Sequence, residues 1–369
     1  MFEDLIKKYD WEQLKESILS KKESDVLAAL ESEKRTLEDF KALISPAAKN
    51  HLEEMALISN KLTQKRFGKV IQLYLPLYLS NECTNHCVYC GFNHKNDITR
   101  ITLDNNQILK EIEVIKSFGY EHILLVTGEH PGKAGFEYLK NAVMLVKPHF
   151  SLISLEVQPL SADEYRELGQ LGVNTVYVYQ ETYNIMKYSE YHPAGKKSDF
   201  LYRLETPDRI GEAGMHRIGL GCLIGLEDWR TDSFFTAMHL KYLQKKFWKT
   251  KYSISFPRLR PHAGAFQPNS IMTDAELVQL ICAYRLLDEE VELSISVRES
   301  RKFRDNVVKL GITSMSAGSR TEPGGYALNT KALEQFEVHD GRSPAEIEQM
   351  IKNQGYEAVW KDWDSFMQI

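Results

Sequence analysis

The sequence has few cysteines and no long apolar run. Only five of its 369 residues are cysteine, an odd number that does not suit a framework of paired disulfides. Cys222 and Cys282 stand alone in apolar surroundings, where a thiol behaves as a small hydrophobe, so both are expected in the core. The first ten residues are charged, and no segment approaches the length of a membrane-spanning helix. We therefore expect a cytoplasmic protein with reduced thiols and no membrane partner.

The sequence also lacks an excess of either charge. Lysine and arginine number 46, aspartate and glutamate number 51, and the formal net charge is −5. The basic residues are interspersed with acidic ones and form no stripe, which argues against nucleic acid as a partner. Because 43% of the residues are hydrophobic, a chain of this length can bury a sizeable core in one large domain with appendages.

Three of the cysteines are concentrated in one short segment. Cys83, Cys87 and Cys90 directly follow the apolar segment 70–79. A four-iron cluster held by three thiolates keeps one iron open to a small molecule, and that open iron makes the cluster a catalyst. The alternative is a structural zinc site with His86 or His94 as a fourth ligand. Zinc usually takes two separated ligand pairs, however, and the chain has no second pair of cysteines.

The hydrophobic pattern predicts an α/β fold. Apolar residues recur at helical spacing over residues 1–66, and strand-like and helical segments alternate from residue 70 onward. Eight such units predict a (βα)8 barrel of the TIM type, although an open six-unit barrel stays possible. The expected strands are 70–79, 121–127, 151–157, 173–179, 216–222, 251–256, 291–297 and 312–317.

The same pattern divides the chain into three parts. We expect an N-terminal helical extension over residues 1–68, the barrel over 69–326, and a C-terminal extension over 327–369 that packs on the barrel. Ser161, Thr273 and Ser343 each precede a glutamate by three residues. This capping box satisfies two backbone N–H groups and contributes on the order of 1 kcal/mol, so helices are expected to begin there.

Polar residues gather where the second and third strands end, which is where a barrel of this type carries its chemistry. Gly128 permits close approach of the backbone, and Glu129 offers a carboxylate to a ligand ammonium. Glu156 needs a cation or a polar ligand, because a lone buried carboxylate costs several kcal/mol. These three residues are candidates for ligand binding.

Further candidates follow later strands. Gln180 ends the fourth strand, and Ser319 and Arg320 end the eighth, where an arginine fork suits an amino-acid carboxylate. The loop 256–264 carries three cationic side chains, and taken alone it is expected at the surface.

The cysteine segment, with Tyr89 just before its last cysteine, resembles the cluster loop of radical S-adenosylmethionine (radical SAM) enzymes. The resemblance narrows to the 2-iminoacetate synthase family, the tyrosine lyases that supply the thiazole ring of thiamine. It extends along nearly the whole chain and rests on segments 79–92, 179–183, 191–197, 256–266, 316–326 and 359–363.

The resemblance implies cofactors and site residues. It implies a [4Fe-4S] cluster on Cys83, Cys87 and Cys90, with SAM at the open iron. The side chain of Arg320, with Ser319, is expected to bind the tyrosine carboxylate. The expected SAM contacts are Tyr89, Gly128, Glu129, Glu156 and Gln180.

The resemblance also implies a reaction. A flavodoxin or ferredoxin reduces the cluster, SAM is cleaved, and the resulting radical starts cleavage of the Cα–Cβ bond of L-tyrosine. The products are dehydroglycine and p-cresol, with methionine and 5′-deoxyadenosine, and thiazole synthase is the expected recipient of dehydroglycine. A related lyase acting on tryptophan and a non-enzymatic iron-sulfur electron-transfer or scaffold protein stay open. A tyrosine lyase of complex-cluster assembly has extra cysteines near its C-terminus, whereas the last cysteine here is Cys282.

Overall fold

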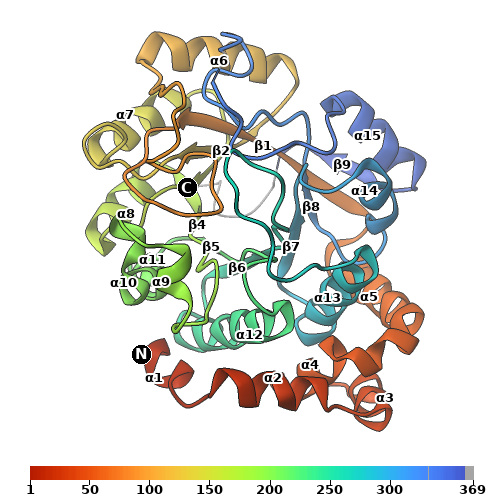
Figure 1. Cartoon of the computed structure of the whole chain (residues 1–369). Helices are drawn as coiled ribbons and strands as arrows, with labels where there is room; N and C mark the ends of the chain where they lie inside the picture. Colours follow the sequence, from red (N-terminus) through yellow and green to blue (C-terminus); the bar gives the residue numbers. More distant parts are fainter. Residues whose placement is uncertain (331, 362–369) are drawn as a thin grey trace.

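A closed barrel of eight parallel strands forms the centre of the computed structural model, which describes residues 1–330 and 332–361 (Figure 1). The strands follow one another in chain order, and β1 closes the barrel by pairing with both β8 and β2. The closure confirms the predicted TIM-type fold and rules out the open six-unit alternative. The strands are β1 Val70–Ser80, β2 His122–Thr127, β3 Leu152–Glu156, β4 Val173–Tyr177, β5 Arg217–Leu220, β6 Lys251–Ser255, β7 Glu292–Ile295 and β8 Ser314–Ser316.

Helices connect the strands and surround the barrel (Figure 1). Two of them begin at predicted capping boxes: the Ser161 hydroxyl accepts from the Glu164 N–H, and the Thr273 hydroxyl accepts from the Glu276 N–H. The connecting helices are α6 Asn105–Ser117, α7 Phe136–Val146, α8 Ala162–Gln170, α9 Tyr188–Tyr191, η2 Lys196–Ser198, α10 Phe200–Leu204, α11 Thr206–Glu212, α12 Trp229–Lys246, α13 Asp274–Leu287 and α14 Arg301–Val307.

The N-terminal helices pack on the outside of the barrel, mainly against α12 and α13 (Figure 1). Trp11 stacks on Phe235 of α12 with ring centroids 5.7 Å apart. The Asn60 side chain donates to the Lys309 carbonyl oxygen (2.7 Å), just before β8 begins. These helices are α1 Phe2–Ile6, α2 Trp11–Leu19, α3 Glu23–Glu31, α4 Leu37–Ile44, η1 Pro46–His51 and α5 Leu52–Phe67.

The C-terminal extension contributes a strand that the hydrophobic pattern did not predict. β9 (Glu357–Val359) pairs in parallel with the first residues of β1, outside the closed barrel. The preceding helix, α15 (Pro344–Asn353), begins at the capping box predicted at Ser343. Trp360 packs edge-on against Tyr120, whereas Trp363 of the resemblance segment lies outside the described residues.

The isolated cysteines lie in the core, as predicted. Cys222 is 5% exposed and Cys282 is 0% exposed. Over residues 1–330 and 332–361, no helix combines the length and the apolar character that crossing a bilayer requires.

Candidate active site

The cysteine loop that follows β1 lies between the end of β2 and the segment 191–197. The Thr84 N–H donates to the Glu129 carbonyl oxygen (3.0 Å), and the His86 N–H donates to the Ala194 carbonyl oxygen (3.0 Å). These bonds join three backbone segments that are distant in sequence. They hold the loop without using the thiols.

Gly195 lets the segment 191–197 lie directly on the cysteine loop. Its φ is 95°, and a Cβ there would lie 2.7 Å from the Asn85 Cα. The Asn85 side chain accepts from the Lys197 N–H (3.0 Å) and donates to the Glu129 carboxylate (2.7 Å). A residue with a side chain would strain this backbone and collide with the loop. Gly195 is therefore the contact point of the two segments.

The three thiols of the loop line one cavity, which we call the cluster cavity. Burial raises the pKa of Cys83 to about 11, and repulsion from Cys90 and Glu129 adds to the shift. Burial likewise raises the pKa of Cys87 and Cys90. The thiols are therefore neutral in the metal-free protein and must release protons when they bind iron.

The donor set fits a four-iron cluster with one open iron, because three thiols face the same cavity. The rings of His86 and His94 stack on each other at 5.4 Å, and the His94 Nδ1 donates to the Cys83 carbonyl oxygen (3.0 Å). Across the part of the chain that the structure describes, no three His, Cys, Asp or Glu side chains are grouped so as to hold a single metal ion.

Gly128 and Glu129 lie beside the thiols, where β2 ends. A Cβ on Gly128 would lie 2.3 Å from the Glu82 carbonyl oxygen, so glycine allows the close approach that the sequence indicated. The Glu129 carboxylate accepts from Arg203 (2.9 Å). Burial alone would raise the pKa of Glu129, but Arg203 and Lys197 together hold it below its ordinary value. Glu129 is therefore a charged, partly buried carboxylate.

A second buried carboxylate continues this charged cluster. Glu181 pairs with Lys197 at 2.6 Å and with Arg203 at 3.5 Å. Burial alone would lower the pKa of Lys197, but the neighbouring carboxylates and thiols raise it overall. Both cations stay charged beside the cysteines. The cluster cavity is thus walled by thiols on one side and by paired charges on the other.

Tyr89, between Cys87 and Cys90 on the cysteine loop, is held by a histidine. The Tyr89 hydroxyl donates to the His192 Nε2 (2.7 Å), and the His192 Nδ1 donates to the Tyr188 carbonyl oxygen (2.9 Å). Burial, with repulsion from Lys197 and Arg203, lowers the pKa of His192 to about 2. His192 is therefore neutral, and it fixes the ring of Tyr89.

A larger cavity, the barrel cavity, adjoins the cluster cavity and contains about 1080 Å³ of empty space, part of it open to solvent. Cys90, Glu156 and Glu181 line both cavities. The two cavities are therefore continuous with each other, which is the arrangement that a cofactor and a substrate in contact require.

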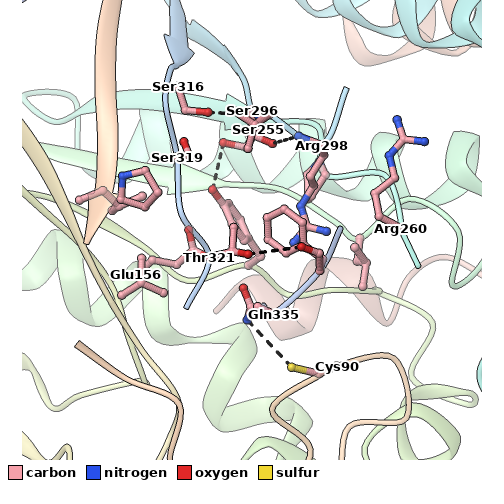
Figure 2. Close-up of a pocket in the computed structure, with 18 of the residues that line it drawn as sticks. Cys90, Glu156, Ser255, Arg260, Ser296, Arg298, Ser316, Ser319, Thr321 and Gln335 are labelled. Carbon is pink, nitrogen blue, oxygen red and sulfur yellow. Dashed lines mark hydrogen bonds between the residues drawn. The ribbon is translucent and has the colours of Figure 1, made fainter. Parts of the chain in front are cut away.

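Glu156 and Arg298 bring opposite charges to the barrel cavity (Figure 2). Burial raises the pKa of Glu156 to about 7, and Glu181 adds to the rise, while Arg298 opposes it. The Arg298 guanidinium lies over the ring of Phe336, with its carbon 3.3 Å from the ring centroid. In the described ranges it forms no ion pair with a carboxylate, so it is available to a ligand anion.

The sequence of this chain is similar to those of two 2-iminoacetate synthases. The chain is 50% identical to 2-iminoacetate synthase of Escherichia coli over 99% of this chain and 97% of that protein. It is 48% identical to 2-iminoacetate synthase of Salmonella typhimurium, with the same coverage. The chain belongs to the 2-iminoacetate synthase family.

Family models and solved structures agree with this membership. Residues 77–234 match the model of the radical SAM superfamily, and residues 255–357 match that of the biotin and thiamin synthesis associated domain. The crystal structure of HydG, a maturase of the [FeFe]-hydrogenase, superposes with a TM-score of 0.90 at 30% identity, covering 95% of this chain and 80% of that one. The predicted cofactors, a [4Fe-4S] cluster and SAM, are those of this family of radical SAM lyases.

Most of the predicted site residues come together, but two lie elsewhere. Gln180 is buried outside the lining of both cavities, and its amide has no hydrogen-bond partner among the described residues. Strand alternation turns Tyr177 and Tyr179 inward and Gln180 outward. The following residue, Glu181, has a φ of 71° and lines both cavities instead.

Arg320 is exposed and outside the lining of the barrel cavity, and its backbone N–H donates to the Tyr326 hydroxyl (2.9 Å). Ser319 does line this cavity, with a buried hydroxyl that lacks a partner in the described chain. Cations of the cavity come from other loops: Arg298 follows β7, Arg260 follows β6, and Lys197 belongs to the segment 191–197.

The loop 256–264 is only partly at the surface: Pro261 and Gly264 are exposed, but its two arginines are not. Arg258 is 8% exposed and pairs with Glu299, and Arg260 pairs with the same carboxylate at 2.8 Å. Glu299 compensates both cations, which the sequence could not indicate because it lies on another loop. Lys197, Arg203, Arg298, Gln335 and Phe336 were missed as site residues. Arg298 alone had a usable signal, its position just after a predicted strand.

Proposed function

We propose that this chain cleaves the Cα–Cβ bond of L-tyrosine to dehydroglycine and p-cresol, with 5′-deoxyadenosine and methionine as further products, for thiamine thiazole biosynthesis. One observation carries the proposal: the cavity lined by the three thiols adjoins the cavity that contains Glu156 and Arg298. A carboxylate and a free guanidinium are the groups that recognise the two ends of an amino-acid zwitterion. The cluster cavity supplies the radical chemistry next to them.

We assign the cofactors to residues as follows. Cys83, Cys87 and Cys90 hold the cluster, while Tyr89, Gly128 and Glu129 contact SAM. When bound, the cluster and SAM supply a carbon-centred radical that removes a hydrogen atom from the substrate. Glu181, rather than Gln180, contacts SAM, because Glu181 lines both cavities.

We assign the substrate carboxylate to Arg298, with Ser319, in place of Arg320. Stacking on Phe336 orients the Arg298 guanidinium before the substrate arrives, so less entropy is lost on binding. Glu156 lines both cavities and therefore faces SAM on one side and the substrate ammonium on the other. Its carboxylate can accept a proton from that ammonium near neutral pH.

The C-terminal extension completes the wall around the substrate. The Gln335 N–H donates to the Thr321 carbonyl oxygen (3.0 Å), and the Glu337 N–H donates to the Pro261 carbonyl oxygen (3.1 Å). Gln335 and Phe336 thereby line the barrel cavity. A radical must be kept from water and from other C–H bonds, and this segment serves that containment. We retain the boundaries 1–68, 69–326 and 327–369 for the three parts.

Partners and location follow from the proposed reaction. A flavodoxin or a ferredoxin is the proposed electron donor, and thiazole synthase is the proposed recipient of dehydroglycine, which hydrolyses readily. Both partners are cytoplasmic, as is the proposed location of this chain. Neither nucleic acid nor a membrane has a role in this reaction.

Anaerobic reconstitution tests the proposal. The protein is supplied with iron, sulfide, SAM, a reductant and either L-tyrosine or L-tryptophan, and the products are analysed. We expect p-cresol and dehydroglycine from tyrosine and no indole product from tryptophan. An indole product would instead identify a tryptophan lyase. If SAM leaves the EPR spectrum of the reduced cluster unchanged, the cluster is structural and the proposal fails.

A further inference from the structure

One end of the barrel cavity is lined by hydroxyl groups. We call the set Tyr74, Tyr179, Ser255, Ser294 and Ser316 the hydroxyl belt. The Tyr179 hydroxyl donates to the Ser255 Oγ (3.0 Å), and the Ser294 hydroxyl donates to the Tyr74 oxygen (3.3 Å). In Figure 2 Ser255 and Ser316 lie at one end of the cavity, and Cys90 lies at the other.

Strand register pairs members of the hydroxyl belt across neighbouring strands. Ser255 on β6 is directly opposite Ser294 on β7, and Tyr74 on β1 is directly opposite Ser316 on β8. Bulky branched residues normally fill the interior of such a barrel. Serine leaves space there, and a buried hydroxyl is costly unless it is hydrogen-bonded. Serine side chains on three neighbouring strands thus create a polar recess.

The hydroxyl belt has protons to offer a ligand. The Ser255 oxygen accepts from Tyr179, so the hydroxyl hydrogen of Ser255 is free to turn toward the cavity. The Ser316 oxygen accepts from the Val297 N–H (3.1 Å), and the Tyr74 oxygen accepts from Ser294. The Tyr74 and Ser316 hydroxyls also interact with each other, so this pair keeps one hydrogen for a ligand. No charged side chain belongs to the belt, which suits a neutral hydroxyl better than a carboxylate or an ammonium.

Two charged residues of the cavity lie between the belt and the cysteines. In Figure 2 Glu156 and Arg298 occupy this middle position. An amino acid whose carboxylate binds Arg298 and whose amino group faces the cluster cavity extends its side chain toward the belt. We infer that the hydroxyl belt binds the phenolic hydroxyl of the substrate and selects tyrosine over aromatic amino acids that lack this group. This inference rests on the proposed function.

The selection has a physical basis. A site built to hydrogen-bond a substrate hydroxyl rejects an analogue without it, because the buried polar groups of the site are then left unpaired. L-Phenylalanine differs from L-tyrosine by this hydroxyl alone. The belt therefore predicts a preference for tyrosine over phenylalanine on the order of 100-fold or more in dissociation constant.

Calorimetric titration tests the inference on the anaerobic, cluster-loaded protein with SAM and without reductant, so that no substrate is consumed. The variants are Ser255→Ala, Ser316→Ala and Tyr74→Phe, measured with L-tyrosine and L-phenylalanine. We expect each variant to lower the preference for tyrosine by about tenfold or more, through weaker tyrosine binding, while phenylalanine and SAM bind as before. Ser253→Ala is the matched control, because Ser253 lies on the same strand but outside the cavity lining.

Two results would overturn the inference. An unchanged preference in all three variants would show that the belt does not contact the phenol. Weaker SAM binding with an unchanged preference would show that the belt serves the cofactor. Failure of the proposed function looks different: the unaltered protein would then bind neither amino acid or would release no p-cresol when reduced, and the inference would fall with it.

Discussion

The buried carboxylates at the mouth of the barrel differ in whether a cationic side chain pairs with them. Glu129 pairs with Arg203, and Glu181 pairs with Lys197 and Arg203. Such pairs recover part of the cost of burial. Glu156 has no comparable partner in the described chain, and its pKa of about 7 reflects that cost. A carboxylate in this condition is a functional candidate, because it destabilises the protein that lacks a ligand.

Glu156 should make the stability of the metal-free protein depend on pH. Its pKa is 4.5 in the unfolded reference and about 7 in the fold, so the folded state binds the extra proton between these values. Below pH 4.5 the residue costs nothing, and the penalty grows between pH 4.5 and about 7 and is constant above that. Glu156→Gln should thus raise the free energy of unfolding at pH 8 by roughly 2–3 kcal/mol, and little at pH 4.5. Urea unfolding at both pH values checks this, and a pH-independent difference contradicts it.

Arg298 and Arg320 offer a direct comparison of two arginines. Arg298→Lys keeps the charge but loses the planar fork, and it should weaken tyrosine binding about tenfold or more. Arg320→Lys should leave the affinity unchanged, because Arg320 is exposed outside the cavity lining. Equilibrium titration of tyrosine measures both. The reverse ranking would return the carboxylate to Arg320.

At the scale of elements, function depends on two segments that lie outside the strands and the long helices of the barrel. The segment 191–197 seats the cysteine loop through Gly195, and residues 335–336 complete the barrel cavity. Both are held by backbone hydrogen bonds to other loops. The rigid barrel supplies the platform on which these loops are positioned.

Gly195→Ala should damage the cluster site more than glycine strain alone would. Gly214 provides the control, because its φ of 77° is similarly left-handed but nothing lies within 4 Å of a Cβ there. Gly214→Ala should cost about 1 kcal/mol of stability and retain iron, whereas Gly195→Ala should cost about 2–3 kcal/mol and lower the iron content. Thermal unfolding and iron analysis report both effects. Equal behaviour of the two variants would mean that the contact with Asn85 is unimportant.

Removing the C-terminal extension should uncouple the cleavage of SAM from the cleavage of tyrosine. A chain ending at residue 326 lacks Gln335 and Phe336, so water reaches the barrel cavity. We expect 5′-deoxyadenosine to form in excess over p-cresol. Ser343→Ala is the control, because it weakens α15 by about 1 kcal/mol but keeps the segment. Full coupling and solubility of the shortened chain would refute a sealing role.

On the scale of the whole molecule, the fold of the chain itself positions the cysteine loop. The hydrogen bonds that position the cysteine loop use backbone groups and the side chains of Asn85, Asn93 and His94, and none of these bonds requires a thiolate. The site therefore depends on the folded barrel rather than on the metal. This distinguishes the chain from small metal-dependent domains, which fold only when the metal binds.

Removal of iron should consequently leave the fold intact. The metal-free protein should keep its far-UV circular dichroism, and loading with cluster and SAM should raise Tm by mass action. Cys90→Ala should lose the iron-sulfur absorbance, whereas Cys282→Ala, a change in the core, should keep it. Unfolding on iron removal contradicts the prediction. A colourless divalent ion in place of iron and sulfide would point to zinc.

The sequence by itself determined the barrel and the grouping of three cysteines on one loop, because both depend on local order. The alternation of apolar and helical segments specified eight strands within a few residues, and Cys83, Cys87 and Cys90 share one loop. Only the tertiary structure decided which charges face the cavities. Glu181 rather than Gln180, and Arg298 rather than Arg320, line them, because the direction of a side chain after a strand ends is set by contacts with loops far away in sequence.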